Sequence, residues 1–279
     1  MKIAVIGIGL IGGSMAITLK EKGLATTIIG VDTNESHQKQ AIDLGLVDKI
    51  AGLDEAIEEA DLVILAVPVD RAATVLPAIM QKVDKQVVMD VASTKSALIR
   101  LARQSNSGGR YVATHPMWGT EFSGPGAAVK GAFTDKAVVI CDKENSDPDA
   151  LQLVEKVYEA LGMHIIYMNA EAHDVHAAYV SHISHITSFA LANTVLEKEK
   201  EDDAIFELAS GGFESTVRLA KSNAEMWVPI FLENRENVLD VLNEHISQLK
   251  KFKSCLEKEN EVWLKELIQN ANTIARILK

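Results

Sequence analysis

The sequence has few cysteines and no long apolar run. Its two cysteines, Cys141 and Cys255, lie far apart in a chain of 279 residues and have no CxxC spacing. This pattern predicts reduced thiols rather than a disulfide framework. No apolar run reaches the roughly 20 residues that span a bilayer. The start, MKIAVIGIGLIGG, lacks the features of a signal peptide. We therefore expect a cytoplasmic protein that does not associate with membranes.

Positive charge is also scarce. The chain has 28 basic and 39 acidic residues, which gives a net charge of −11. Because an acidic surface repels phosphate backbones, we expect no nucleic-acid partner. The length exceeds what one domain commonly needs, so two domains are predicted.

The first part of the chain, residues 1–168, alternates strand-like and helix-like segments. Short apolar runs between amphipathic segments predict an α/β fold with a mostly parallel sheet covered on both faces. Asp147-Pro148 is typical of a helix N-cap followed by proline at the first helical position. The expected strands span 2–7, 26–32, 61–68, 86–92, 110–116, 136–141 and 164–168, and expected helices include 14–23, 54–60 and 94–104.

The second part, residues 169–279, has helical spacing to its end and predicts an all-α domain. Leu239, Leu242, Ile246 and Leu249 recur at gaps of 3, 4 and 3, and Leu256, Trp263, Leu267, Ile274 and Ile277 continue the apolar stripe. Such a seam buries against another helix. We expect a homodimer through this domain; packing within one chain is the alternative.

A glycine-rich turn follows the first predicted strand and precedes the first helix. In the stretch Gly7-Ile8-Gly9-Leu10-Ile11-Gly12, the glycines fit the GxGxxG motif, which brings a pyrophosphate close to the backbone at a helix N-terminus. Asp32 ends the second strand 20 residues after Gly12, where a carboxylate accepts hydrogen bonds from the adenosine ribose. A 2′-phosphate would be repelled there, so the sequence predicts NAD.

Two further turns are expected at the cofactor, because ligands bind beyond the carboxyl ends of parallel strands. Val67-Pro68 ends one buried strand, and Ser93 follows the next. Ser93 either faces the nicotinamide or caps the following helix, and the sequence leaves both open.

His115 ends another predicted strand, in ATHPMWGTE, and so points towards the same edge of the sheet. A dehydrogenase needs a base that takes the hydroxyl proton, and histidine suits that task. The alternative is a histidine that caps a loop.

The helical half contains His173, His176, His182 and His185. On a straight helix these form two pairs on roughly opposite faces, so they cannot close one metal site, and we expect no metal. Further on, Gly211-Gly212 precedes Arg218. An arginine there either binds a substrate carboxylate bidentately or forms a surface salt bridge.

The segments GIGLIGGS, DVASTK, THPMWGTE, SHISH, GGFESTVR and AEMW occur in an order and at separations that resemble the prephenate and arogenate dehydrogenase family of tyrosine biosynthesis. The resemblance covers nearly the whole chain. It implies a Rossmann-type nucleotide domain, a helical dimerisation domain and an NAD(P)-dependent oxidative decarboxylation that makes the substrate ring aromatic.

The resemblance also implies roles for residues. His115 is the catalytic base, Ser93 lies between it and the nicotinamide, and Arg218 binds a substrate carboxylate. The substrate pocket is lined by Glu121, His185, Gly211 and Trp227. With Asp32 favouring NAD, we expect an NAD-dependent prephenate dehydrogenase. The alternatives are an arogenate dehydrogenase, another dehydrogenase of similar architecture, and a dinucleotide-binding module without catalysis.

Overall fold

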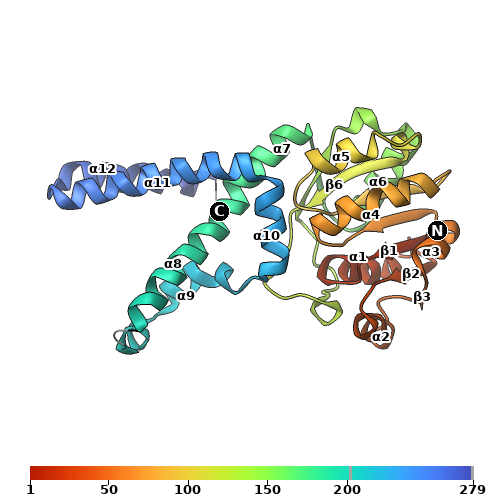
Figure 1. The fold of residues 1–279 in the computed structure, drawn as a ribbon, viewed down its shortest axis with the longest axis horizontal. Coiled ribbons are helices and arrows are strands. Elements are labelled where there is room, and N and C mark those ends of the chain that lie inside the picture. The colour runs from red at the N-terminus through yellow and green to blue at the C-terminus, as the bar shows by residue number, and fades with distance from the viewer. Residues whose placement is uncertain (201–202, 278–279) are drawn as a thin grey trace. The chain divides into compact units, whose positions relative to one another are not determined.

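A computed structural model describes residues 1–200 and 203–277, and it divides into two compact units, Met1–Asn234 and Arg235–Lys279 (Figure 1). Within these described residues, no helix is both long and apolar enough to cross a membrane. Cys141 and Cys255 are buried and free, as the sequence predicted. Burial raises the pKa of the Cys141 thiol to about 12, so this thiol stays protonated and inert.

The first unit is built on one eight-stranded sheet. All neighbouring strands are parallel except β6 and β7, which are antiparallel. The strand order is β3 (Lys49–Ile50), β2 (Thr27–Val31), β1 (Lys2–Ile6), β4 (Leu62–Leu65), β5 (Val87–Asp90), β6 (Tyr111–Pro116), β7 (Ala137–Cys141) and β8 (His164–Met168). The predicted α/β sheet is therefore confirmed.

Both faces of this sheet are covered, which explains why the central strand β4 is apolar at every position. In β4, Val63 and Leu65 belong to one hydrophobic core, and Leu62 and Ile64 belong to the other. The helices that follow the strands are α1 (Leu10–Glu21), α2 (Glu35–Asp43), α3 (Leu53–Glu59), α4 (Val69–Lys82), α5 (Ser96–Ala102) and α6 (Pro148–Ala160).

Two predicted helix starts have different outcomes. Asp147 is the N-cap residue of α6 and Pro148 its first residue, as predicted, although the Asp147 side chain makes no cap hydrogen bond. The helix predicted over 94–104 begins only at Ser96, with Lys95 at the N-cap position. Ser93 therefore does not cap this helix, and that alternative is wrong.

The rest of the first unit is helical. It comprises α7 (Ala170–Ala177), a π-helical turn η4 (Ala178–His182), α8 (Ile183–Glu199), α9 (Gly211–Val217) and α10 (Ala224–Glu233). The segment that joins β6 to β7 crosses to the other end of the sheet. Its short 3-10 turn η2 (Pro125–Ala127) packs on α1 and α2.

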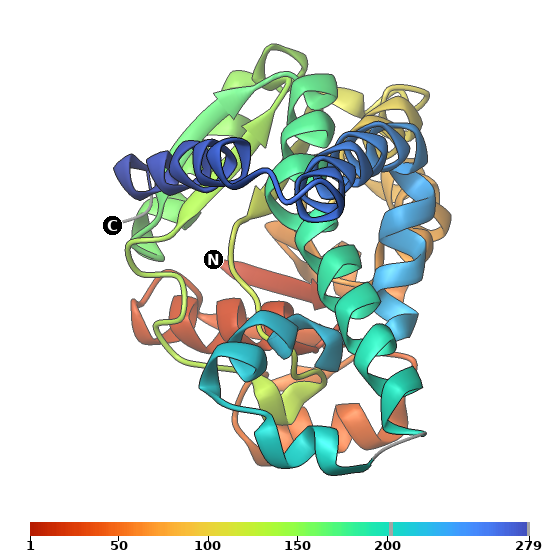
Figure 2. The same ribbon diagram turned by 90° about the vertical axis from the view of Figure 1, so that its left-hand side faces the viewer.

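The second unit is a pair of helices, α11 (Arg235–Glu257) and α12 (Glu261–Asn272). Figure 2 shows α12 folding back from the end of α11. Glu259 takes a positive φ of 50° at the turn, and the Asn260 side chain caps α12 by accepting the Trp263 N–H at 3.0 Å. Much of the predicted seam is exposed in the single chain, including Leu249, Leu256 and Ile277. The domain boundary at residue 168 stays a prediction.

Candidate active site

The glycine-rich turn has room for a pyrophosphate at one defined point. Gly7 has a φ of +93°, and an added Cβ would lie 2.6 Å from the Ala66 carbonyl oxygen. A Cβ on Gly12 would lie 2.2 Å from the Gly7 carbonyl oxygen, so both positions require glycine. At Gly9 a Cβ would meet no atom within 4 Å, so the space beside this residue is open.

The open space lies at the N-terminus of α1, where Gly9 is the N-cap and Leu10 and Ile11 begin the helix half-buried. The cap makes no side-chain hydrogen bond, and the first turn holds no acidic residue. Amide N–H groups and the helix dipole favour an anion at such a place. The predicted pyrophosphate site fits this geometry.

We expect two alanine substitutions in this turn to have opposite consequences. Gly7→Ala forces a strained φ and a clash with backbone, and should lower the free energy of unfolding by about 1–3 kcal/mol. Gly9→Ala fills open space, and should change stability by less than about 1 kcal/mol while weakening NAD binding by about tenfold. Thermal unfolding without cofactor and NAD titration of each variant check this. Unchanged NAD affinity in Gly9→Ala would place the pyrophosphate elsewhere.

Asp32, Val67, Pro68 and Ser93 all lie at the carboxyl ends of the strands. Asp32 follows β2, and its carboxylate accepts the Ile8 N–H of the glycine-rich turn at 3.2 Å. Val67 is half-buried, while Pro68 is exposed and caps α4. Ser93 is half-buried in the turn between β5 and α5. The structure thus gathers these predicted residues along one edge, and their contacts to a cofactor stay predictions.

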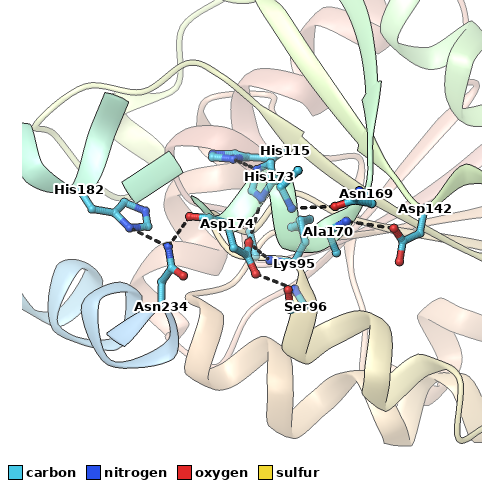
Figure 3. A network of polar contacts seen from close by, with 12 residues as sticks. Lys95, Ser96, His115, Asp142, Asn169, Ala170, His173, Asp174, His182 and Asn234 are labelled. Carbon is cyan, nitrogen blue, oxygen red and sulfur yellow. Dashed lines mark hydrogen bonds and ion pairs between the residues drawn. The ribbon is translucent and has the colours of Figure 1, made fainter. Parts of the chain in front are cut away.

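His115, half-buried on β6, is the first member of a chain of polar groups (Figure 3). Its Nδ1 lies 2.8 Å from Nε2 of His173 on α7, and the two rings meet edge to face. Nδ1 of His173 lies 2.9 Å from Oδ1 of Asp174. This carboxylate also accepts the backbone N–H groups of Lys95 at 2.8 Å and Ser96 at 2.9 Å. It therefore caps the start of α5 from a distant part of the chain.

The chemistry of Asp174 determines the proton positions along this chain. Burial opposes its ionisation, but hydrogen bonds from His173, Ser96 and Lys95 outweigh burial and lower its pKa to about 2. An ionised carboxylate only accepts hydrogen bonds, so His173 Nδ1 carries a proton and donates it. In neutral His173, Nε2 is then an acceptor, and His115 Nδ1 is its donor. The remaining nitrogen, Nε2 of His115, is left as a bare lone pair.

The surroundings of His115 keep it uncharged. Burial, the facing His173 ring and the side chains of Lys95 and His182 hold the pKa of His115 well below the ordinary histidine value. A histidine whose pKa is lowered stays neutral above that lowered pKa, so the imidazole remains able to accept a proton as the pH falls below its ordinary value. The structure thus provides a neutral base at the edge of the sheet.

Lys95 is a buried cation that sequence reasoning did not assign. Its Nζ forms an ion pair with Asp90 at the end of β5 and donates to the Thr114 carbonyl oxygen at 2.6 Å. Asp90 Oδ1 also accepts the Tyr111 hydroxyl at 2.7 Å. Because Thr114 directly precedes His115, this network fixes the end of β6 against β5. Asp90 and Lys95 are the first and last residues of DVASTK, which is the signal that could have identified them.

The π-helical turn overturns the straight-helix prediction for the four histidines. His173 and His182 are both buried, whereas His176 is exposed, so the predicted pairs do not share faces. The π-helical turn between α7 and α8 contains more residues than an α-helical turn, so the side chains after it point in other directions than regular helical spacing predicts. Asn234 connects α7 with the π-helical turn that follows it. Its amide donates to the Asp174 carbonyl oxygen at 2.7 Å and lies 3.2 Å from His182 Nδ1 (Figure 3).

Four of the five remaining predicted substrate residues form two pairs. His185 stacks on Trp227, with ring centroids 3.5 Å apart and an interplanar angle of 26°. Arg218 Nη1 lies 3.5 Å from Glu121 Oε2. Gly211 is exposed at the first position of α9, with open space around it. Burial lowers the pKa of His185, and the Arg218 charge lowers it further. Both predicted roles of Arg218 remain compatible with its position beside Glu121.

No metal site is seen in the described part of the chain, where no group of three or more His, Cys, Asp or Glu side chains is arranged to hold an ion. The chemistry that these residues support is proton transfer beside a dinucleotide. His173 and Asp174 were missed as partners of the base, because their contact with His115 joins segments 58 residues apart.

Comparison with known proteins identifies two matching family models. The nucleotide-binding domain of prephenate dehydrogenase matches residues 15–167, and the prephenate dehydrogenase dimerization domain matches residues 169–270. The cyclohexadienyl dehydrogenase of Zymomonas mobilis is 31% identical to this chain, over 99% of the chain and 96% of that protein.

Solved structures agree with these matches. Prephenate dehydrogenase from Aquifex aeolicus, in complex with hydroxyphenyl propionate and NAD+, superposes with a TM-score of 0.89 at 30% identity, over 100% of this chain and 98% of that one. Synechocystis arogenate dehydrogenase superposes with a TM-score of 0.81 at 29% identity, with both chains fully covered.

Proposed function

Because the chain belongs to the prephenate dehydrogenase family, we propose that it catalyses the NAD-dependent oxidative decarboxylation of prephenate to 4-hydroxyphenylpyruvate and CO2. The observation that carries this proposal is the neutral base at His115, which lies at the same strand edge as the glycine-rich turn. The predicted family, the NAD cofactor and the assignment as an oxidoreductase are confirmed by the family matches and the NAD+-bound relative.

NAD, when bound, accepts a hydride from the substrate. The residues of this chain supply the other requirements. His115 Nε2 accepts the proton of the ring hydroxyl, and His173 and Asp174 hold the imidazole in the tautomer that can do so. Loss of CO2 and formation of the aromatic ring provide driving force, so the protein mainly aligns the substrate and removes one proton.

The second requirement is positive charge for a substrate with two carboxylates, in a protein of net charge −11. Arg218 is the proposed ligand of one carboxylate, since its side chain is 54% exposed and its guanidinium can form a bidentate pair. Its partner Glu121 is proposed to stay beside Arg218 at the pocket. Ser93 is proposed to lie between His115 and the nicotinamide, and His185, Gly211 and Trp227 are proposed to line the pocket.

Prephenate is favoured over arogenate by the position of Glu121. An acidic residue near the substrate side chain would attract the ammonium group of arogenate. In this structure the Glu121 carboxylate already faces the Arg218 guanidinium, which reduces that attraction. We further propose a homodimer through the helical domain, with the exposed apolar side chains of α11 and α12 in the interface. The absence of a nucleic-acid partner and the cytoplasmic location stay predictions.

The proposal is tested by initial rates of reduced-cofactor formation with prephenate or arogenate, each with NAD or NADP. Fastest turnover with prephenate and NAD is expected. Faster turnover with arogenate would overturn the substrate assignment and keep the proton chemistry. No turnover in any mixture would overturn the reaction itself.

We expect Arg218→Gln to raise KM for prephenate by about 10- to 100-fold, the usual worth of a charged hydrogen bond, with a smaller change in kcat. Arg100→Gln, which removes an exposed arginine on α5, is the matched control and should leave both constants unchanged. Steady-state kinetics on both variants decide this. An unchanged KM in Arg218→Gln would show that Arg218 forms only a surface salt bridge and does not bind the substrate carboxylate.

A further inference from the structure

The segment that joins β6 to β7 contacts both halves of the candidate site. We call residues 117–136 the crossing segment. It starts two residues after His115 and carries Glu121, whose carboxylate lies 3.5 Å from the Arg218 guanidinium. Further along, its 3-10 turn η2 packs on α1 and α2, the helices that follow β1 and β2. One continuous stretch of chain therefore connects the proposed substrate pocket with the helix that begins at the glycine-rich turn.

The two ends of the crossing segment lie together. Trp118 near its start meets Phe133 near its end, edge to face, with ring centroids 5.2 Å apart, and Phe133 is fully buried. The Met117 N–H donates to the Ala137 carbonyl oxygen at 2.8 Å. The crossing segment is therefore a closed loop, and the position of its middle depends on contacts with other elements.

Ser14 on α1 makes the most direct of these contacts. Its hydroxyl donates to the Leu10 carbonyl oxygen at 2.6 Å and accepts the Val129 N–H at 2.8 Å, and its side chain is fully buried. Leu10 is the first residue of α1, at whose N-terminus the pyrophosphate is expected. One hydroxyl thus joins the first turn of this helix to the crossing segment. Ser14 is also the last residue of GIGLIGGS, beyond the glycines that the dinucleotide motif explains.

Two further contacts along α1 hold the same stretch of the crossing segment. A Cβ on Gly13 would lie 3.0 Å from the Ala128 Cβ, so only glycine allows this close approach. One helical turn after Ser14, the Thr18 hydroxyl accepts the Gly131 N–H at 3.2 Å and donates to the Ser14 carbonyl oxygen at 2.7 Å. The helix therefore presents small and hydroxyl-bearing residues where the crossing segment lies against it.

We propose that Ser14 is a positioning residue for the substrate pocket: by holding Val129 on α1, its hydroxyl couples occupation of the pyrophosphate site to the position of Glu121 beside Arg218. Ser14 is fully buried and acts only through the crossing segment. A bound pyrophosphate fixes the first turn of α1, and a segment bonded to that turn then loses less freedom when the substrate binds. The inference rests on the proposed function for the roles of Glu121 and Arg218.

The first test is hydrogen exchange, measured by mass spectrometry on the whole protein with and without saturating NAD, in peptides that cover residues 119–131. In the unaltered protein we expect NAD to slow exchange in these peptides by about tenfold. Ser14→Ala leaves the Val129 N–H without its acceptor, so NAD should still bind but protect these peptides by less than about twofold. Equal protection in Ser14→Ala, or no protection in the unaltered protein, would overturn the proposal.

A second variant reaches the same contact by another route. Gly13→Ala removes no hydrogen bond but pushes Ala128 away from α1, so it should also abolish the protection by NAD. Calorimetric titration with NAD and thermal unfolding verify that both variants bind the cofactor and are folded. Full protection in folded Gly13→Ala would contradict a role for the close contact between α1 and the crossing segment.

Steady-state kinetics separate positioning from a general loosening of the fold. Ser14→Ala should raise KM for prephenate by about tenfold at saturating NAD, with kcat nearly unchanged, because the reacting groups stay in place. Ser105→Ala is the matched control. The Ser105 hydroxyl likewise donates to a helix carbonyl oxygen, that of Met80, at 3.0 Å, and accepts a backbone N–H, that of Ser107, at 3.3 Å.

Ser105 precedes β6 and so lies at the opposite edge of the sheet, and its substitution should change neither KM nor the exchange of the crossing segment. Equal increases of KM in Ser14→Ala and Ser105→Ala would overturn the positioning role. Absence of turnover in the unaltered protein would instead overturn the proposed function. The exchange test needs no substrate, so it decides the coupling in either case.

Discussion

His115→Asn should lower kcat by about 10²–10⁴-fold, the range expected for loss of a general base. Asparagine retains a polar group of similar reach at the end of β6, but its amide cannot accept the substrate proton. KM for prephenate should change much less, since the carboxylate ligand Arg218 is untouched. Steady-state kinetics with saturating NAD measure both effects.

The matched control is His176→Asn. His176 lies on α7 three residues after His173 but is exposed, so its substitution should leave kcat and stability unchanged. Full activity in His115→Asn would contradict the proposed mechanism. Equal losses in both variants would indicate a general effect on folding rather than on proton transfer.

Asp174→Asn should cause the largest combined loss of stability and activity. The carboxylate accepts three N–H groups, from Lys95, Ser96 and His173, and an amide in its place brings an NH2 group against one of these donors. We expect the free energy of unfolding to fall by about 3 kcal/mol, as for a broken buried charge contact. kcat should also fall by about 10²-fold or more, because the tautomer of His173, and with it that of His115, is no longer fixed.

The two effects of Asp174→Asn are separable. Chemical denaturation gives the stability, and kcat is measured at a temperature where the variant is fully folded. Asp43→Asn, which changes an exposed acidic residue near the end of α2, should alter neither quantity. Full kcat in folded Asp174→Asn would show that Asp174 only caps α5. Unchanged stability would contradict the capping contacts.

The sheet was largely predictable from sequence because its strands are continuous apolar runs. β4 and β5 are buried at every position. Short buried runs between helices have few stable arrangements other than strands of a sheet that helices cover on both faces. The two-residue strand β3 has no such signal, and its pairing with β2 depends on tertiary contacts. The antiparallel pairing of β6 with β7 could also not be predicted from the sequence, because the direction of β7 depends on the path of the segment that joins the two strands.

The candidate site was predictable where one local motif carries the chemistry. The glycines of the first turn and Asp32 lie within 26 residues of sequence, so their spacing alone predicted a dinucleotide site. The partners of His115 were not predictable in this way. His173 reaches it only because α7 packs against α5 and β7. The π-helical turn after α7 also breaks the regular spacing on which the helical prediction depended.

The most direct test of the account is the protonation state of His115 itself. Nuclear magnetic resonance of 15N-histidine-labelled protein, assigned by comparison with His115→Asn, distinguishes a protonated from a bare ring nitrogen. The account predicts a neutral ring with Nδ1 protonated and Nε2 bare at neutral pH, and the same state as the pH falls below the ordinary histidine pKa of ~6.5. An imidazolium at neutral pH, or a proton on Nε2, would contradict it.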